Sequence, residues 1–223
     1  MKNKYIILII ITIYTLYYIA SILNYKIDTS VRNLCNNIYL HGENKKYSII
    51  KSLFSKTECL TIIQRAEDYG NKYGWKKTRH QNYPTNDNRL TRKWDIYSMI
   101  KNKIINKVYN ELESLFKINK SKLGINEIFI VKYSETGQRS LEYHKDGSEF
   151  SFIICLNKDF TGGGTEFENP NKIINLNIGD CLVFCGQNRH KGRYINSGTR
   201  YILTGFLNFG GMETCHEYMK FIN

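Results

Sequence analysis

The chain of 223 residues is long enough for one domain with a sizeable hydrophobic core and some appendages, but hardly for two independent domains. Lys and Arg number 32 against 20 Asp and Glu, and the net charge of +12 favours anionic partners in general. The sequence after the N-terminal segment contains no long run of Lys and Arg interleaved with aromatic residues, so a dedicated nucleic-acid surface is not expected. The six cysteines include no C-x-x-C pair, which argues against a structural zinc site and a thioredoxin-like redox motif.

The cysteines fall into two groups by their neighbours in the sequence. Three lie in apolar runs and are expected to be buried free thiols: Cys155, Cys181 and Cys185. The other three could form a disulfide in an oxidising compartment: Cys35, Cys59 and Cys215.

The N-terminal segment is strongly apolar. Tyr5 to Leu23 is nineteen residues without a charge, and a helix of that length nearly matches the hydrocarbon thickness of a bilayer. Lys2 and Lys4 precede it, so the positive-inside rule leaves the N-terminus cytosolic and sends the rest of the chain across the membrane. We therefore expect a transmembrane signal anchor over residues 1–25.

Residues 26–46 are polar without periodicity and are expected to be a tether between membrane and domain. A cleaved signal peptide is the alternative, because Ala20 and Ser21 could mark a cleavage site and the protein would then be secreted. Both alternatives place the domain in a lumenal or extracytoplasmic compartment such as the endoplasmic reticulum. The glycosylation sequon at Asn119 is compatible with that placement.

The domain is expected to span residues 47–223 and to begin with a short strand at Tyr47. Ser55 and Glu58 have the spacing of a capping box, which predicts that a helix begins there and ends near Gly70. Residues 71–94 are polar, aromatic and rich in turn residues, and predict an ordered loop without regular structure. Apolar residues at three- and four-residue steps predict a second helix over residues 96–117.

After Gly124 the sequence becomes a series of short apolar or alternating runs separated by Gly, Asn, Asp and Ser. About eight strands without intervening helices predict a mainly β (α+β) domain with a barrel or jelly roll over about residues 126–210. The two preceding helices are expected to pack on its outside.

Three residues in this half could bind a metal. His144 and Asp146 are two residues apart, so in a strand they would point to the same face, while His190 would come from another strand. Two histidines and one carboxylate are the ligand set typical of non-haem Fe(II), with coordination positions left for O2 and a co-substrate.

Arg200 follows ten residues after His190, in a strand whose neighbouring residues are apolar on both faces. A guanidinium buried in a barrel requires an anion to offset its desolvation, and a carboxylate bound through two hydrogen bonds would serve. Arg200 is therefore a candidate for binding an acidic co-substrate.

Several motifs together resemble the prolyl 4-hydroxylase family of 2-oxoglutarate- and Fe(II)-dependent dioxygenases, which includes animal lysyl hydroxylases in its wider group. The matching residues surround the candidate metal ligands and are Tyr133, His144-x-Asp146, Phe160-Thr-Gly-Gly-Gly-Thr-Glu-Phe167, Gly179-Asp180, His190-Lys-Gly192 and Gly198-Thr-Arg200-Tyr. The resemblance extends to the first helix through Phe54, Glu58 and Cys59.

This resemblance implies a double-stranded β-helix that holds Fe(II) on the three ligands, with 2-oxoglutarate and O2 as co-substrates and L-ascorbate keeping the iron reduced. Arg200 would bind the far carboxylate of oxoglutarate, helped by the hydroxyls of Tyr133 and Thr204. Oxoglutarate would be decarboxylated to succinate as a peptidyl residue is hydroxylated, with proline expected first and lysine second. In the predicted loop, His80 and Tyr83 would face the peptide or protein substrate, or alternatively would only cover the barrel.

Two rival functions have less support from the sequence. A nucleic-acid demethylase of the same superfamily would carry a second arginine six residues after the first, where this chain has Phe206. A non-catalytic barrel that acts as a binding subunit would be expected to have lost at least one of the four site residues.

Overall fold

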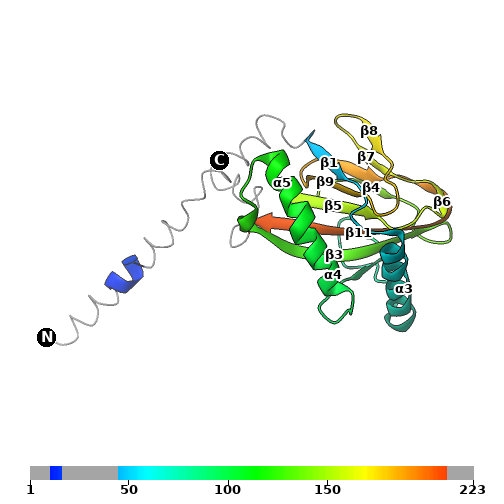
Figure 1. The fold of residues 1–223 in the computed structure, drawn as a ribbon, viewed down its shortest axis with the longest axis horizontal. Coiled ribbons are helices and arrows are strands. Elements are labelled where there is room, and N and C mark those ends of the chain that lie inside the picture. The colour runs from blue at the N-terminus through cyan, green and yellow to red at the C-terminus, as the bar shows by residue number, and fades with distance from the viewer. Residues whose placement is uncertain (1–10, 17–44, 210–223) are drawn as a thin grey trace.

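The computed structural model describes residues 11–16 and 45–209 (Figure 1). Residues 11–16 are helical, and the rest of the predicted anchor and nearly all of the tether lie outside the described residues. Within the two described ranges, no helix is both long enough and apolar enough to cross a membrane.

Two antiparallel sheets form the body of the domain. The larger, seven-stranded sheet has the order β1-β9-β5-β11-β3-β2, with β6 also paired to β11. Its strands are β1 (Tyr47–Ile50), β2 (Asp87–Arg89), β3 (Leu123–Ser134), β5 (Phe150–Cys155), β6 (Phe160–Gly162), β9 (Cys181–Cys185) and β11 (Ile195–Phe209). The smaller, four-stranded sheet has the order β4-β10-β7-β8. Its strands are β4 (Leu141–His144), β7 (Thr165–Phe167), β8 (Lys172–Ile174) and β10 (His190–Gly192).

The larger sheet is apolar on both faces because alternate residues of its strands enter two different cores. On β3, Ile128 and Ile130 belong to the core on the helical side, whereas Phe129 and Val131 belong to the core shared with the smaller sheet. This two-sided burial explains why the central strands have nearly continuous apolar sequences.

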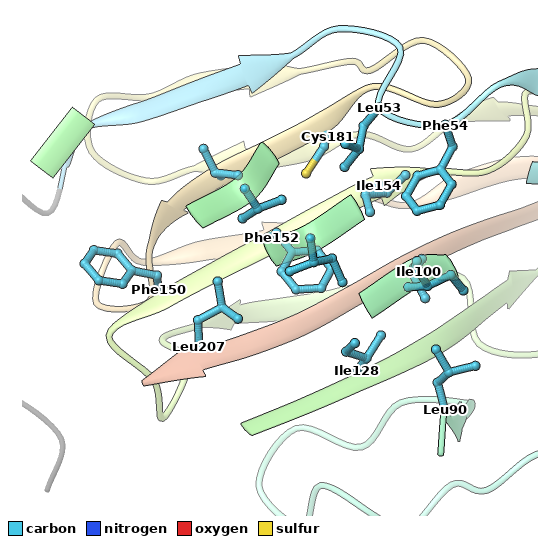
Figure 2. Close-up of a cluster of buried hydrophobic side chains, with 14 of the residues drawn as sticks. Leu53, Phe54, Leu90, Ile100, Ile128, Phe150, Phe152, Ile154, Cys181 and Leu207 are labelled. Atoms are coloured by element: carbon cyan, nitrogen blue, oxygen red, sulfur yellow. The ribbon is translucent and has the colours of Figure 1, made fainter. Parts of the chain in front are cut away.

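Helices cover one face of the larger sheet, with α4 and α5 running across its strands (Figure 1). The helical elements are α3 (Lys56–Tyr73), α4 (Tyr97–Lys103), a π-helical turn η2 (Ile104–Val108), α5 (Tyr109–Phe116) and a 3-10 turn η3 (Lys120–Lys122). Figure 2 shows part of the core beneath them, where Phe152 and Ile154 of β5 lie near Ile100 of α4. The predicted mainly β fold with supporting helices on its outside is confirmed.

The first predicted helix begins as expected but ends later. The Ser55 side chain accepts a hydrogen bond from the Glu58 amide, and the Glu58 carboxylate accepts one from the Ser55 amide, so the capping box is complete. The predicted end at Gly70 is wrong, because the helix continues to Tyr73 and ends at Gly74, which has a φ of +79°. Gly70 instead allows close packing, since a Cβ there would lie 2.2 Å from Nε1 of Trp75.

The predicted loop and the second predicted helix also differ in detail from the structure. Within residues 71–94, Asp87–Arg89 forms strand β2 by pairing with the edge of β3. The three polar residues of β2 carry no apolar alternation, so only the partner strand reveals the pairing. The helix predicted over residues 96–117 is present, with the π-helical turn η2 in its middle.

Four of the six cysteines lie among the described residues and all four are buried free thiols: Cys59, Cys155, Cys181 and Cys185. Three of these are as predicted. The disulfide suggested for Cys59 is not formed within the described residues, because its thiol faces the core beneath α3. Cys35 and Cys215 lie outside the described residues.

Candidate active site

The smaller sheet brings the three predicted metal ligands together. His144 is the last residue of β4, His190 is the first residue of β10, and the two are directly paired in the antiparallel register. Their ring centroids lie 4.4 Å apart. One ligand atom from each of His144, Asp146 and His190 lies within 4.8 Å of the others. The sequence spacing therefore predicted a real cluster.

Both imidazoles present Nε2 to the centre of this cluster. The distance from Nε2 to the nearer Asp146 oxygen is 3.4 Å for His144 and 3.8 Å for His190. Each Nδ1 instead lies against a backbone carbonyl, 2.8 Å from Glu142 and 2.9 Å from Asn188. A proton on Nδ1 satisfies each carbonyl and leaves the lone pair of Nε2 free for a metal.

The Asp146 carboxylate is held by its own set of contacts. The Ser151 hydroxyl donates a hydrogen bond to Oδ2 of Asp146, and the Ser148 hydroxyl lies 3.2 Å from that of Ser151. The backbone is also fixed, because the Asp146 amide donates to Gly186 O and Gln187 Nε2 donates to Asp146 O. The carboxylate thus has a defined orientation toward the histidines.

Burial and mutual charge set the pKa values of the three ligands. Burial would raise the pKa of Asp146, but the two histidines and Ser151 outweigh it and lower that pKa. Burial lowers the pKa of His190, whereas for His144 the hydrogen bond and charge of Asp146 outweigh burial and raise the pKa. An ionised carboxylate between two nitrogen donors fits a divalent first-row metal such as Fe(II).

The cluster opens into a cavity of about 620 Å³ that also contains Arg200. Arg200 lies on the inner face of β11, is 5% exposed, and stacks over the Tyr133 ring at 5.4 Å. Its Nη1 has no hydrogen-bond partner among the described residues, and burial lowers its pKa. A buried cation with a free N–H in a cavity is a binding site for an anion.

The chain is similar in sequence to several much longer proteins. No family model matches the chain. The chain is 30% identical over 168 residues to human procollagen-lysine,2-oxoglutarate 5-dioxygenase 2, which covers 70% of this chain and 23% of that protein. It is 28% identical over 206 residues to the procollagen lysyl hydroxylase and glycosyltransferase of Acanthamoeba polyphaga mimivirus, covering 86% of this chain and 21% of that protein. The chain therefore spans less than a quarter of these two relatives.

A solved structure decides the fold. The viral collagen prolyl hydroxylase of Paramecium Bursaria Chlorella virus-1, in its 2-oxoglutarate complex, superposes with a TM-score of 0.58 at 19% identity, over 74% of this chain and 96% of that one. This chain has the double-stranded β-helix fold of the 2-oxoglutarate- and Fe(II)-dependent oxygenases. The family resemblance predicted from the motifs is confirmed.

Tyr133 and Thr204, the two residues predicted to help Arg200 bind oxoglutarate, both line the cavity. Tyr133 is 2% exposed and lines the cavity beside Arg200; burial raises the pKa of its phenol, although Arg200 opposes this shift. Thr204 also lines the cavity, but its hydroxyl donates a 2.6 Å hydrogen bond to the carbonyl of Phe152. The predicted help of both hydroxyls in binding oxoglutarate stays a prediction.

The two predicted substrate-facing residues lie at the rim of the same cavity. Tyr83 is 40% exposed, and its ring centroid is 5.0 Å from that of His144. His80 packs against Phe129 at 4.9 Å and against Phe206 at 6.0 Å. The structure thus brings the loop to the cavity that contains the His-Asp-His cluster.

Further residues of the site were not predicted from the sequence. Thr165, Lys145 and Lys191 line the cavity, and Ser151 and Gln187 hold Asp146. Lys191 is next to a predicted ligand, but whether its side chain reaches the cavity depends on the bulge between β10 and β4. Ser151 is five residues from Asp146, a spacing with no meaning until the intervening turn is known.

Proposed function

We propose that this chain is an Fe(II)- and 2-oxoglutarate-dependent dioxygenase that hydroxylates a peptidyl residue and converts 2-oxoglutarate to succinate. The observation that carries the proposal is a single cavity holding both a buried His-Asp-His cluster and a buried Arg200 whose Nη1 has no partner among the described residues. A purely structural role would leave Nη1 of that guanidinium buried without a hydrogen-bond partner to offset its desolvation.

The residues of the chain divide the work between them. His144, Asp146 and His190 hold the iron, which when bound supplies activation of O2 coupled to the loss of CO2 from oxoglutarate. Arg200 binds the far carboxylate of oxoglutarate, with the Tyr133 phenol beside it. Ascorbate would keep the bound iron reduced, as the resemblance to this family implies.

Apolar side chains complete the cavity between the metal ligands and Arg200. Val131, Ile153 and Ile202 come from three neighbouring strands of the larger sheet and line this wall. A dry wall strengthens the pairing between a carboxylate and a guanidinium and keeps water from the reacting C–H bond.

Peptidyl lysine and peptidyl proline are both candidates for the substrate residue. The names of the two curated relatives described above support lysine in a procollagen-like chain. The motifs that resemble the prolyl 4-hydroxylase family, and the similarity in fold to a viral collagen prolyl hydroxylase, support proline. The charges of the cavity favour neither residue, because Lys191 pairs with Glu166 at 3.0 Å and Arg200 is assigned to oxoglutarate.

The test is succinate formation from 2-oxoglutarate by the full chain with Fe(II) and ascorbate, in the presence of prolyl or lysyl collagen-like peptides. Succinate that rises with one peptide supports the proposal and identifies the residue hydroxylated. His190→Ala should abolish this succinate and weaken Mn(II) binding, while Arg65→Gln on the outside of α3 should change neither. Mn(II) binding without any oxoglutarate turnover would instead support the non-catalytic barrel.

We also propose that residues 1–25 anchor the protein in a membrane with the domain on the lumenal or extracytoplasmic side. Support comes from the uncharged run of Tyr5 to Leu23 and from Lys2 and Lys4 before it. Cleavage after Ala20 would give a secreted protein with the same domain in the same compartment.

A further inference from the structure

The segment from Lys76 to Asp87 is a closed loop whose tip lies at the cavity. Its two ends are joined by paired backbone hydrogen bonds, Lys76 N to Asp87 O at 3.0 Å and Asp87 N to Lys76 O at 2.9 Å. Residues 80–83 at the tip all line the cavity. The loop therefore presents side chains to the site from a base that is fixed to the larger sheet through β2.

The carboxylate of Asp87 ties the two arms of this loop together from within. It is fully buried and accepts hydrogen bonds from Arg79 Nε on one arm and from Thr85 Oγ1 on the other. Arg79 continues the network through Nη1, which donates to Glu127 on β3 at 2.8 Å. A buried carboxylate with these partners fixes the distance between the arms, because losing either donor would leave a desolvated charge.

Further hydrogen bonds attach the second arm of the loop, residues 84–87, to the barrel. Gln138, in the turn between β3 and β4, donates from Nε2 to Pro84 O at 3.0 Å. Its Oε1 accepts from the Asn86 amide at 2.8 Å. The segment carrying Tyr83 is thus attached to the element that leads into His144.

We infer that Asp87 is a positioning residue for substrate binding: together with Arg79 it holds residues 80–83 where they contact the peptide. This inference rests on the proposed function and adds to it the residue that sets the shape of the substrate rim. Tyr83 connects this rim to the proposed metal ligands, since its ring lies against that of His144 at 5.0 Å. Asp87 itself does not line the cavity, so its effect passes through the loop.

The test compares Asp87→Asn and Arg79→Lys with the wild-type chain. Asp87→Asn keeps the size of the side chain but removes its charge, and Arg79→Lys keeps the charge but loses the forked contact to Asp87 and Glu127. We expect the KM for the peptide to rise roughly tenfold in both variants, because small misplacements of a binding element are costly. Succinate formed without peptide and Mn(II) affinity should stay near the wild-type values.

Hydrogen exchange provides the readout of position. Amides 80–83 should exchange faster in both variants while those of β5 and β9 stay protected. Asp95→Asn is the matched control, because Asp95 also pairs with an arginine, Arg65, but on the exposed face of the helical layer. It should leave the peptide KM and the loop amides unchanged.

The outcomes separate this inference from the proposed function. Absence of oxoglutarate-dependent succinate in the wild-type chain would sink the proposed function. An active wild-type chain with unchanged peptide KM in both variants would overturn the role of Asp87. Faster hydrogen exchange in β5 and β9 as well as in the loop would also overturn the role of Asp87, because it would show that Asp87 stabilises the whole fold. If Asp87→Asn does not fold, Arg79→Lys decides, since its side chain is partly exposed and keeps its charge.

Discussion

Ser151 fixes the orientation of Asp146 through the hydrogen bond to Oδ2. Ser151→Ala should lower the affinity for Mn(II) by about tenfold, because partners that orient a metal ligand typically contribute that much. Isothermal titration of the metal-free protein measures this directly. Ser48→Ala on β1 is the matched control, and equal affinities in the two variants would show that Asp146 needs no such support.

Arg200 should not tolerate replacement by lysine. Lysine keeps the charge but lacks the planar fork that binds a carboxylate through two hydrogen bonds. The KM for oxoglutarate should therefore rise at least about tenfold in Arg200→Lys, with little change in Mn(II) affinity because Arg200 does not contact the metal ligands. Arg65→Lys is the control; a similar rise in that variant would mean that the effect is not specific to the site.

The sequence predicts the principal site residues and misses those that support them. His144 and Asp146 could be predicted because strand periodicity alone places both on one face. Arg200 could be predicted because a guanidinium in an apolar run requires an anion. Ser151 and Asp87 act through turns that bring distant atoms together, and no periodicity encodes those turns.

Among the elements, the connection between β1 and α3 depends on Asp180. Its carboxylate accepts hydrogen bonds from Lys51 Nζ at 2.9 Å, from the Ser52 amide at 3.0 Å and from the Asn177 amide at 3.2 Å. Ser52 has a φ of +49°, in the left-handed region that non-glycine residues rarely adopt, so this contact stabilises an unfavourable backbone conformation. The neighbouring residue must be glycine, because a Cβ at Gly179 would lie only 1.9 Å from the Phe54 carbonyl oxygen.

Asp180 should make stability depend on pH. Burial alone would raise its pKa, but the bonds from Lys51 and the two amides outweigh burial and lower it. Because the pKa of Asp180 is lower in the folded than in the unfolded chain, its charge stabilises the fold at pH values above the unfolded-state pKa of about 4. This stabilisation is lost as the pH falls through the folded-state pKa.

Asp180→Asn should therefore reduce the free energy of unfolding by roughly 1–3 kcal/mol at pH 7, and by less as the pH falls below about 4. Urea unfolding at several pH values measures the difference between variant and wild type. Asp95→Asn, in an exposed pair, should cost less than about 1 kcal/mol. A difference for Asp180→Asn that does not vary between pH 7 and pH 3 would contradict the assignment.

Elements with their own periodicity or caps were predictable, and those defined by their partners were not. The capping box at Ser55 and the apolar steps of residues 96–117 each carry a local signal. Strand β2 has no such signal, because it exists through its pairing with β3. Gly70 was misassigned as a helix end because close packing against Trp75 and helix termination both favour glycine.

At the scale of the whole molecule, the two cores give the two faces of the larger sheet different tasks. The helical layer packs on the face that carries Ile128 and Ile130, so these residues contribute stability. The opposite face carries Arg200 and Ile202 into the cavity beside the smaller sheet. A one-residue slip in β11 would exchange the two faces and remove Arg200 from the site, and the pairing of Thr199 to Phe206 with β3 holds the register against such a slip.

The proposed membrane anchor predicts where the domain lies in a eukaryotic expression system. Asn119 is exposed at the start of η3, so its sequon should be glycosylated only if the domain reaches a lumenal compartment. The chain should then shift in mobility on glycosidase treatment and remain in the membrane pellet after alkaline extraction. Ser121→Ala removes the sequon while leaving the Asn119 side chain, which caps this turn, in place. A glycosylated protein that leaves the pellet would favour cleavage over anchoring, whereas a chain without glycan that remains in the pellet would reverse the proposed orientation.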